Sequence, residues 1–384
     1  MKKTDIEIID LDKEPLEHLS DDYHRPARDE LSEEELVYDE LEEEPSERED
    51  GEEAEQGKSF LHSPWIHVGF GIFLVLAISF IVYRFLTFGK RINPDEYQGG
   101  DHYNTVESLD DIFPLLRADG SAVLHGDNPS IVLFGNAPFA DDRDSADSLA
   151  NLIAAQANAT VYNCSVSDSY LAAQGATLQN ATQAMDAFTF YWLSTAFCLR
   201  NDASTNNEAI YQDLFASRAE ELSADARQAY DTLMSVDFQT VDVIAICYDG
   251  TDYLEGHRMS DLDNDTNTET FTGNLQAGIE LIQQTYPEIR IIVMSPPYAY
   301  AVAEDGSYKS SDLVRYNDEG TLSSYVISEG GICGVCSVSF VDNLYGTIHE
   351  DIASDYLTDN LHLNLKGRKL MAERFVYALN KYNK

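Results

Sequence analysis

The chain has 384 residues and a formal net charge of −43, with 68 acidic residues against 25 basic ones. Such an excess of negative charge repels nucleic acid and anionic lipid headgroups, so we expect no nucleic-acid partner. Hydrophobic residues make up 43% of the sequence, which is enough for a folded domain with a core.

The N-terminal region, residues 1–60, is dominated by Asp and Glu, as in Glu33–Glu35 and Glu42–Glu44. A segment of this composition buries too little apolar surface to offset the entropy lost on ordering. We therefore predict a disordered acidic tail. Its short apolar islands, around Ile6–Ile9 and Leu36–Leu41, leave open the alternative that part of it docks on a partner.

Residues 64–88 are almost wholly apolar, and Arg84 is the single fixed charge among them. About 20 such residues span the hydrocarbon core of a bilayer. Trp65 and Tyr83 stand where interfacial aromatic residues belong, and Pro64 suits the start of a helix. The sequence thus predicts one transmembrane helix, with the lipid bilayer as a partner.

Two features of the sequence give opposite indications for the orientation of this transmembrane helix. Arg84, Lys90 and Arg91 follow it, which by the positive-inside rule places the C-terminal domain in the cytoplasm. Large domains, however, translocate largely regardless of flanking charge, and an anchor with a short tail usually exports its large domain. We expect a single-pass membrane protein with a cytoplasmic tail and an extracytoplasmic C-terminal domain.

A polar connector at residues 89–127 leads to a globular domain at residues 128–384, in which apolar strand-like runs alternate with helical ones. The predicted strands are Ile131–Phe134, Thr160–Tyr162, Val241–Cys247, Ile289–Met294 and Ser337–Val341. The predicted helices are Ser145–Ala157, Ala184–Leu199, Asn207–Leu222, Ala224–Met234, Phe271–Tyr286, Ser311–Glu329, Gly346–Tyr356 and Asn364–Tyr382. This alternation predicts a three-layer α/β/α fold with a five-stranded, mostly parallel sheet. Ligands in such sheets bind at the carboxyl ends of the strands.

Near the C-terminus, Asp359 lies three residues before His362, at the entrance to the last predicted helix. A histidine that acts as a general base needs a carboxylate partner to fix its tautomer and stabilise its charged form. Asn364 and Gly367 complete the pattern D-x-x-H-x-N-x-x-G. This block resembles the one that carries the catalytic Asp and His in the SGNH/GDSL hydrolases, ester hydrolases on a flavodoxin-like sheet. The resemblance covers roughly residues 128–384 and implies catalytic roles for Asp359 and His362.

The resemblance fails at the nucleophile. The first strand of the family ends in Gly-Asp-Ser, whereas this chain has Gly135-Asn136-Ala137. Ala137 has no nucleophilic atom. The resemblance implies further pocket or oxyanion positions at Asn136, Asn163, Ser165, Thr251 and Asp252, although the family has Gly where Ser165 stands and Asn where Thr251 stands. Losing one oxyanion donor typically raises the barrier by about 2.7–4 kcal/mol.

Four residues near the strand ends are possible substitutes for the missing serine, namely Asp141, Asp142, Ser145 and Ser167. The loop that holds the first three opens a predicted helix, so Asp142 or Asp144 also fits as an ordinary N-cap. Both interpretations stay open at this point.

Three functions are compatible with these residues. The domain is an ester hydrolase that uses another nucleophile or a water activated by His362, or it is a degenerate hydrolase that binds a ligand without turnover. The third is an accessory role in acyl transfer, because membrane-anchored domains of this kind resemble partners of membrane-bound acyltransferases that modify envelope polysaccharides. We expect an envelope glycan or such an acyltransferase as partner.

Other motifs are weaker. Cys333 and Cys336 have redox-motif spacing, but core packing is the favoured interpretation because no second pair or histidine stands nearby. The alternating acids of Asp261–Glu269 resemble a calcium loop without its glycine and its twelfth-position glutamate, so a solvated loop is expected. We predict no metal and no cofactor.

Overall fold

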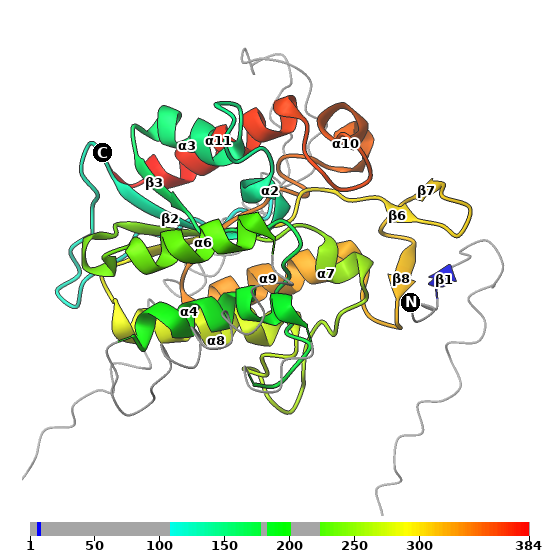
Figure 1. Ribbon diagram of the computed structural model, residues 1–384, viewed down its shortest axis with the longest axis horizontal. Coiled ribbons are helices and arrows are strands. Elements are labelled where there is room, and N and C mark those ends of the chain that lie inside the picture. The colour runs from blue at the N-terminus through cyan, green and yellow to red at the C-terminus, as the bar shows by residue number, and fades with distance from the viewer. Residues whose placement is uncertain (1–5, 9–107, 178–182, 201–222, 384) are drawn as a thin grey trace, which may run out of the picture. The chain divides into compact units, whose positions relative to one another are not determined.

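The computed structural model describes residues 6–8, 108–177, 183–200 and 223–383. Its centre is a five-stranded sheet in the order β3-β2-β4-β5-β9, in which each neighbouring pair is parallel (Figure 1). The strands are β2 (Ser130–Gly135), β3 (Thr160–Asn163), β4 (Val243–Cys247), β5 (Arg290–Met294) and β9 (Ser339–Val341). The predicted α/β class and the five strands are confirmed. Counted along the chain this is the order 2-1-3-4-5, whose topological switch point lies between β2 and β4.

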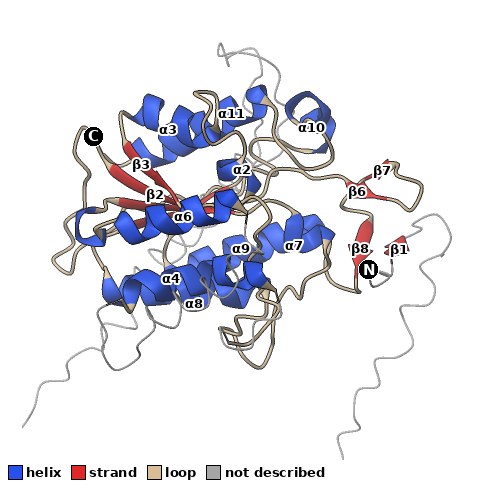
Figure 2. Cartoon of the chain, viewed as in Figure 1, coloured by secondary structure: helices blue, strands red, loops and turns tan. Residues whose placement is uncertain are grey.

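Helices cover both faces of the sheet (Figure 2). On one side α3 (Leu149–Ala157) packs against α11 (Leu365–Asn380), which also contacts α10 (Glu350–Tyr356). On the other side α8 (Phe271–Thr285) packs against α4 (Phe190–Cys198) and α9 (Leu322–Cys336). The remaining helical elements are α6 (Ala224–Ser235), α2 (Ala137–Ala140), α7 (Thr251–Leu254), η5 (Ala184–Phe188) and η6 (Phe238–Thr240).

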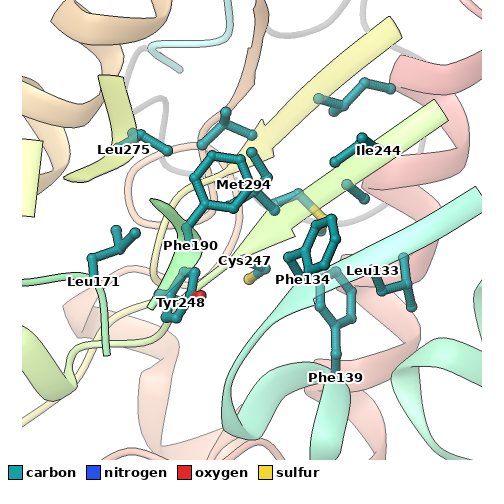
Figure 3. Packing of buried hydrophobic residues seen from close by; sticks show 14 of the residues in the cluster. Leu133, Phe134, Phe139, Leu171, Phe190, Ile244, Cys247, Tyr248, Leu275 and Met294 are labelled. Atoms are coloured by element: carbon teal, nitrogen blue, oxygen red, sulfur yellow. The ribbon is translucent and has the colours of Figure 1, made fainter. Parts of the chain in front are cut away.

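The core lies between the sheet and the helices. All residues of β4 and β5 are buried, which explains why these strands are continuous apolar runs rather than alternating ones. Figure 3 shows Phe134 of β2 beside Phe190 of α4, and their ring centroids are 5.8 Å apart in an edge-to-face arrangement. Each fully buried side chain of this size contributes about 1.5–3 kcal/mol.

Gly135 ends β2, and its conformation is one that only glycine adopts readily. Its φ is +152°, and a Cβ atom built there would lie 1.9 Å from the carbonyl oxygen of Cys247 on β4. The tip of β2 can therefore approach β4 closely only because residue 135 has no side chain.

The predicted helix at Ser311–Glu329 is wrong in its first half. Residues 314–316 form a strand, β8 (Val314–Tyr316), and Asn317 and Asp318 follow with φ of 54° and 59°. Two consecutive left-handed residues cannot continue into a right-handed helix, so α9 begins only at Leu322. It then runs on to Cys336, which places the Cys333–Cys336 pair in its last turn and delays β9 to Ser339.

Part of the expected connector belongs to the folded domain. Asp111 and Phe340 of β9 exchange two backbone hydrogen bonds, of 3.0 and 2.7 Å, in an antiparallel bridge. Ile112 is buried, and the N–H of Phe113 donates to the Ser339 hydroxyl at 3.1 Å. The domain therefore begins before residue 128, the boundary that composition suggests.

Within the described residues, four further strands lie outside the main sheet. β6 (Ala301–Val302) and β7 (Tyr308–Lys309) form a small antiparallel pair. β8 pairs antiparallel with β1 (Ile6–Ile8), so these three residues of the expected tail are in a strand.

The other predictions for the N-terminal region fall outside the described residues. They comprise the rest of the tail, the span at residues 64–88 and the first part of the connector, and the predicted helix at residues 207–222 lies outside as well. Within the described ranges, no helix has the length and apolar character needed to cross a membrane.

Candidate functional site

Asp359 and His362 form a hydrogen-bonded pair. Asp359 Oδ2 and His362 Nδ1 are 2.8 Å apart, and Asp359 Oδ1 accepts the backbone N–H groups of Leu361 and His362 at 2.8 Å each. The Asp359 carboxylate thus holds the backbone of residues 359–362 in a turn and also orients the His362 ring. When the imidazole is neutral, this contact keeps the hydrogen on Nδ1 and leaves Nε2 as the proton acceptor.

The loop that carries the pair lies at the carboxyl ends of β4 and β5. The N–H of Tyr300, which follows β5, donates to the carbonyl of Asn360 at 2.8 Å. A Cβ atom on Gly250, which follows β4, would lie 3.5 Å from Leu361 Cδ1. The pair therefore stands at the edge of the sheet where ligands bind in folds of this kind.

The other two motif residues have structural roles. The Asn364 side chain caps α11 by accepting the N–H groups of Lys366 and Gly367 at 2.8 and 3.2 Å. Gly367 is required by close packing, since a Cβ atom there would lie 2.6 Å from the carbonyl oxygen of Tyr356. Together they set where α11 begins, and hence where His362 stands.

The charges that most affect the pKa of His362 are negative. Partial burial acts to lower the pKa of the imidazole, but the hydrogen bond to Asp359 and the charges of Asp359, Asp141 and Asp249 outweigh it and raise the pKa. Burial also acts to raise the pKa of Asp359, yet the N–H groups of His362 and Leu361 and the His362 ring lower it. Asp141 follows α2 and Asp249 follows β4, so the carboxylates that act on the ring belong to loops at the carboxyl ends of β2 and β4.

Asn136 and Asp249 join the tips of β2 and β4 across the switch point. The Asn136 amide donates to Asp249 Oδ1 at 2.7 Å and to the Ser169 carbonyl at 3.0 Å, and its oxygen accepts the Asp249 N–H at 2.8 Å. Both side chains are buried. Burial raises the pKa of Asp249 to about 6, against the hydrogen bonds from Thr251 and Asn136 and the charge of His362, which act to lower it.

Ala137 is the first residue of α2 and is 3% exposed, so its methyl group is packed inside the protein. Thr251 is the position where the family has an oxyanion donor. Both its hydroxyl and its N–H donate to Asp249 Oδ1, at 2.6 and 3.0 Å. The Thr251 hydroxyl therefore serves the buried carboxylate in this structure.

Ser165 and Asn163 are also tied to the protein. The Ser165 N–H donates to Asn163 Oδ1 at 3.1 Å, and the Asn163 amide donates to the Phe139 carbonyl at 2.7 Å. Arg143 then holds the end of β3 from outside: it donates to the Asn163 carbonyl at 2.8 Å and to the Ser165 carbonyl, and pairs with Asp225 at 2.7 Å. The sequence analysis did not single out Arg143, although one Arg among the three acids of Asp141–Asp144 was a signal.

Asp252 does not reach the Asp359–His362 pair. Its two carboxylate oxygens accept the N–H groups of Leu171 and Ala172 at 2.8 and 2.9 Å, and one of them lies 2.9 Å from Nδ1 of His257. Burial acts to lower the pKa of His257, and the Asp252 contacts raise it overall. This second Asp–His pair was not foreseen from the sequence, which shows no motif at its five-residue spacing.

Of the four possible substitutes, Asp141 and Ser167 come together. The Ser167 hydroxyl donates to Asp141 Oδ1 at 3.5 Å, at the outer limit for a hydrogen bond. Asp142 pairs instead with Arg368 of α11. The contacts of Ser145 are local: its N–H donates to the Asp142 carbonyl at 2.7 Å and its hydroxyl accepts the Asp147 N–H at 3.1 Å.

The remaining motifs form no site. All five cysteines are free, and burial raises the pKa of Cys336 to about 11, so this thiol is not a reactive thiolate at neutral pH. The Asp261 carboxylate is engaged by Asp263 N–H, Asn267 Nδ2 and Arg258. Within the described parts of the chain, no cluster of three or more His, Cys, Asp or Glu residues could hold a metal ion.

Two cavities lie elsewhere. One of about 180 Å³ is lined by Phe113, Ile289, Arg290 and Ser339 at the opposite, amino edge of the sheet. Another of about 550 Å³ lies between residues 109–111, α9 and Phe340. Neither is lined by Asp359 or His362, so the pair stands apart from both cavities.

No protein-family model and no curated protein matches the sequence. Solved structures do. A possible lipase from Chitinophaga pinensis is 14% identical, with a TM-score of 0.40, over 66% of this chain and 98% of that one. A putative GDSL-like lipase from Bacteroides ovatus is 12% identical, with a TM-score of 0.39, over 67% and 100%.

A carbohydrate acetylesterase from Sinorhizobium meliloti is 9% identical, with a TM-score of 0.37, over 66% of this chain and 99% of that one. At such identities and TM-scores the likeness carries no argument about activity. The solved structures to which this chain is similar thus include proteins described as a possible lipase, a putative GDSL-like lipase and a carbohydrate acetylesterase.

Proposed function

We propose that the domain is a hydrolase-like module of the SGNH/GDSL type. In this proposal it binds an acylated ligand or glycan of the cell envelope beside Asp359 and His362 and forms no acyl-enzyme at residue 137. The main support for this proposal is the difference between the Asp–His pair and the nucleophile and oxyanion positions of the same site. The Asp–His pair is intact and half-exposed, whereas the groups at the nucleophile and oxyanion positions are inert or committed to the protein itself.

The chemical reason is that acyl transfer needs a nucleophile and donors aimed at the developing oxyanion. Ala137 offers a buried methyl group. The Thr251 hydroxyl and the Ser165 N–H donate to Asp249 and Asn163, so neither points to a ligand without first breaking a hydrogen bond. A half-exposed imidazole beside carboxylates still provides a polar contact for a hydroxyl or carbonyl group.

The test uses the full chain in detergent micelles and a panel of acetylated envelope-glycan fragments. We expect binding that His362→Ala weakens by at least tenfold, with no hydrolysis of p-nitrophenyl acetate above that of buffer. His349→Ala is the matched control, because His349 lies at the start of α10 and contacts Asp351 rather than this site. Equal affinity of the two variants would refute a binding role for His362.

A second candidate is an ester hydrolase that uses a different nucleophile. It is favoured by the hydroxyl of Ser167, which lies against Asp141, a carboxylate whose pKa responds to His362. In this case Ser167 or a water activated by His362 attacks the ester. Turnover of p-nitrophenyl acetate that falls in both Ser167→Ala and His362→Ala would support this candidate. Turnover lost only in His362→Ala would indicate water activation.

Anchoring and topology are parts of the same proposal. The apolar run at residues 64–88 would hold the domain at the membrane, with the acidic tail in the cytoplasm and a membrane-bound acyltransferase as one possible recipient of its ligand. The pairing of β1 with β8 requires residues 6–8 and 314–316 on one side of the bilayer, if both belong to one chain.

Labelling of intact cells with a membrane-impermeant maleimide separates these arrangements. Ser121→Cys reports on the domain, where residue 121 is exposed, and Ser46→Cys reports on the tail. The proposed topology gives labelling at residue 121 only, and this result would mean that β1 does not pair with β8 of the same membrane-anchored chain. Labelling at residue 46 alone reverses the orientation. Labelling at both residues, or at neither, places the tail and the domain on one side of the membrane, as the β1–β8 pairing requires, and refutes the proposed topology.

A further inference from the structure

Arg290, the first residue of β5, is a buried cation whose hydrogen bonds all go to neutral oxygens. The residue is 8% exposed. Nη1 donates to the Leu379 carbonyl at 2.8 Å, and Nη2 donates to the Ala378 carbonyl at 3.0 Å, both at the end of α11. In the part of the chain that the structure describes, no carboxylate pairs with Arg290, and its Nε is buried without a partner. A buried charge without a counter-ion is costly.

The acidic composition of the chain makes this missing partner unusual. The sequence offers 68 Asp and Glu residues, and Arg143 and Arg368, whose side chains are 11% exposed, each pair with an aspartate. Burial lowers the pKa of Arg290, against an opposing effect of Tyr382. Capping of the last carbonyls of α11 explains the contacts of Nη1 and Nη2. It leaves Nε without an acceptor.

Arg290 also lines a cavity. This is the cavity of about 180 Å³ at the amino edge of the sheet, whose walls are mostly apolar and include Phe113, Leu115 and Val338. Pro287 and Ser337, which are exposed, belong to the same lining, so the cavity lies at the protein surface. An apolar cavity of about 150 Å³ is large enough to hold benzene. The space beside Arg290 therefore admits a small organic molecule.

We propose that this cavity binds a small carboxylate with a short apolar tail, whose two oxygens accept hydrogen bonds from Nε and Nη2 of Arg290. On a guanidinium these two N–H groups are parallel, and a carboxylate matches their spacing. The Ser339 hydroxyl now accepts from Nη2 at 3.4 Å, near the outer limit for a hydrogen bond, and donates to the Phe113 carbonyl at 3.1 Å. A carboxylate that displaces Ser339 from Nη2 leaves its bond to Phe113 intact.

The lining favours a carboxylate over a phosphate. Arg290 is the one charged residue among those that line the cavity, all of which the structure describes. A phosphate dianion would place uncompensated charge and unbonded oxygens against apolar walls. A carboxylate carries a single charge, and its tail gains from burial against Phe113, Leu115 and Val338. This proposal does not rest on the proposed function, because neither Asp359 nor His362 lines the cavity.

The first test varies the ligand. The full chain in detergent micelles is titrated with trifluorobutyrate by fluorine NMR, and acetate, propionate, butyrate, butyramide and inorganic phosphate then compete with it. Affinity should rise about fourfold with each CH2 from acetate to butyrate. Butyramide has the shape of butyrate without its charge, and phosphate has charge without a tail, so each should compete about tenfold less well or worse. Competition by either that equals that of butyrate overturns the proposal, as does a wild type that does not bind trifluorobutyrate.

The second test locates the site with two wall variants that leave Arg290 in place. Leu115→Trp fills the cavity and should weaken trifluorobutyrate binding by about tenfold or more. Leu116→Trp is the matched control, because Leu116 is exposed and does not line the cavity, so the affinity should not change. Equal affinities of these two variants overturn the proposal.

Arg290→Gln removes the cation and should weaken binding by about tenfold or more. Arg290→Lys keeps the charge without the parallel N–H groups, so its affinity should lie between those of Arg290→Gln and the wild type. Wild-type affinity in Arg290→Gln is contrary to the proposal. If Arg290→Gln fails to fold because α11 loses its cap, the comparison of Leu115→Trp with Leu116→Trp decides alone.

Discussion

The side chain of Asn136 and the whole of Asp249 hold each other by two hydrogen bonds, of 2.7 and 2.8 Å, across the tips of β2 and β4. This contact fills the centre of the site with a carboxylate that also takes up the hydroxyl and N–H of Thr251. At the switch point of the sheet, a ligand group would ordinarily accept hydrogen bonds from the protein. Here the donors of Asn136 and Thr251 are already bonded to Asp249.

The first prediction concerns pH. Burial raises the pKa of Asp249 to about 6 from an ordinary value of 3.8. The unfolded chain therefore releases this proton first, so the free energy of unfolding falls as pH rises from about 4 to about 6 and is then constant. Relative to Asp249→Asn, the wild type should lose about 3 kcal/mol over this window. Urea unfolding of both proteins at several pH values measures this loss. A difference in unfolding free energy between wild type and Asp249→Asn that does not change with pH would contradict the prediction.

The second prediction concerns the imidazole. Asp359→Asn keeps an oxygen that can accept the N–H groups of Leu361 and His362 but removes the negative charge that raises the pKa of His362. The pKa of His362 should therefore fall, measured by NMR titration of Cε1–H. The raised pKa stabilises the folded protein below the ordinary value of 6.5, and this contribution is lost as pH rises through the raised value. A pKa unchanged by Asp359→Asn would show that Asp359 is only a loop cap.

The third prediction compares two glycines. Gly135→Ala should lower the free energy of unfolding by about 3 kcal/mol or more, because the new Cβ collides with the Cys247 carbonyl and φ is +152°. Gly331→Ala in α9 should raise it by about 0.5–1 kcal/mol, since no atom lies within 4 Å of the new Cβ. Chemical denaturation of both variants measures the difference, and equal effects would mean that β2 and β4 are not in close contact.

The fourth prediction compares two arginines. Arg143 is 11% exposed and joins two carbonyls of the β3 end to Asp225, so Arg143→Ala should cost about 2–3 kcal/mol of unfolding free energy. Arg117 makes an exposed ion pair with Glu288, and Arg117→Ala should cost at most about 1 kcal/mol. If Arg143→Ala costs no more than Arg117→Ala, the β3 end is held by other contacts.

The fifth prediction concerns Glu329, whose carboxyl group is buried in α9 with both oxygens unpartnered. Burial raises its pKa well above 4.5, so folding stability declines with pH above that value. Glu329→Met should therefore be more stable than the wild type at pH 8 by about 1–3 kcal/mol. Glu288→Met, at an exposed position, is the control. A Glu329→Met protein that is less stable at pH 8 would show that the carboxyl has a favourable partner.

Much of the sheet could be predicted from sequence because its strands are buried on both faces. Val243–Cys247 and Arg290–Met294 are wholly buried, and a continuous apolar run is how such strands appear in a sequence. The error at Ser311–Glu329 has a local cause. Asn317 and Asp318 adopt left-handed conformations that interrupt a plausible helical pattern, and Gly330 and Gly331 are tolerated inside α9.

The site was predictable only where its residues are close in sequence. Asp359 and His362 pair over three positions, and Asn364 caps the helix that follows. Asp142 and Arg368 are 226 positions apart, and Asn136 and Asp249 are 113 apart, so no local pattern indicates either contact. Arg143 and His257 were missed for a related reason: their partners are set by how loops from different strands meet at one edge.

The strip of chain around Asp111 has a consequence beyond fixing where the domain starts. β9 is the last strand of the sheet, and its exposed edge would be a template for strand addition by another molecule. Asp111 occupies that edge by bonding to both backbone groups of Phe340. The segment that leads into the domain therefore also blocks the pairing of β9 with a strand of another molecule, and so reduces edge-to-edge aggregation.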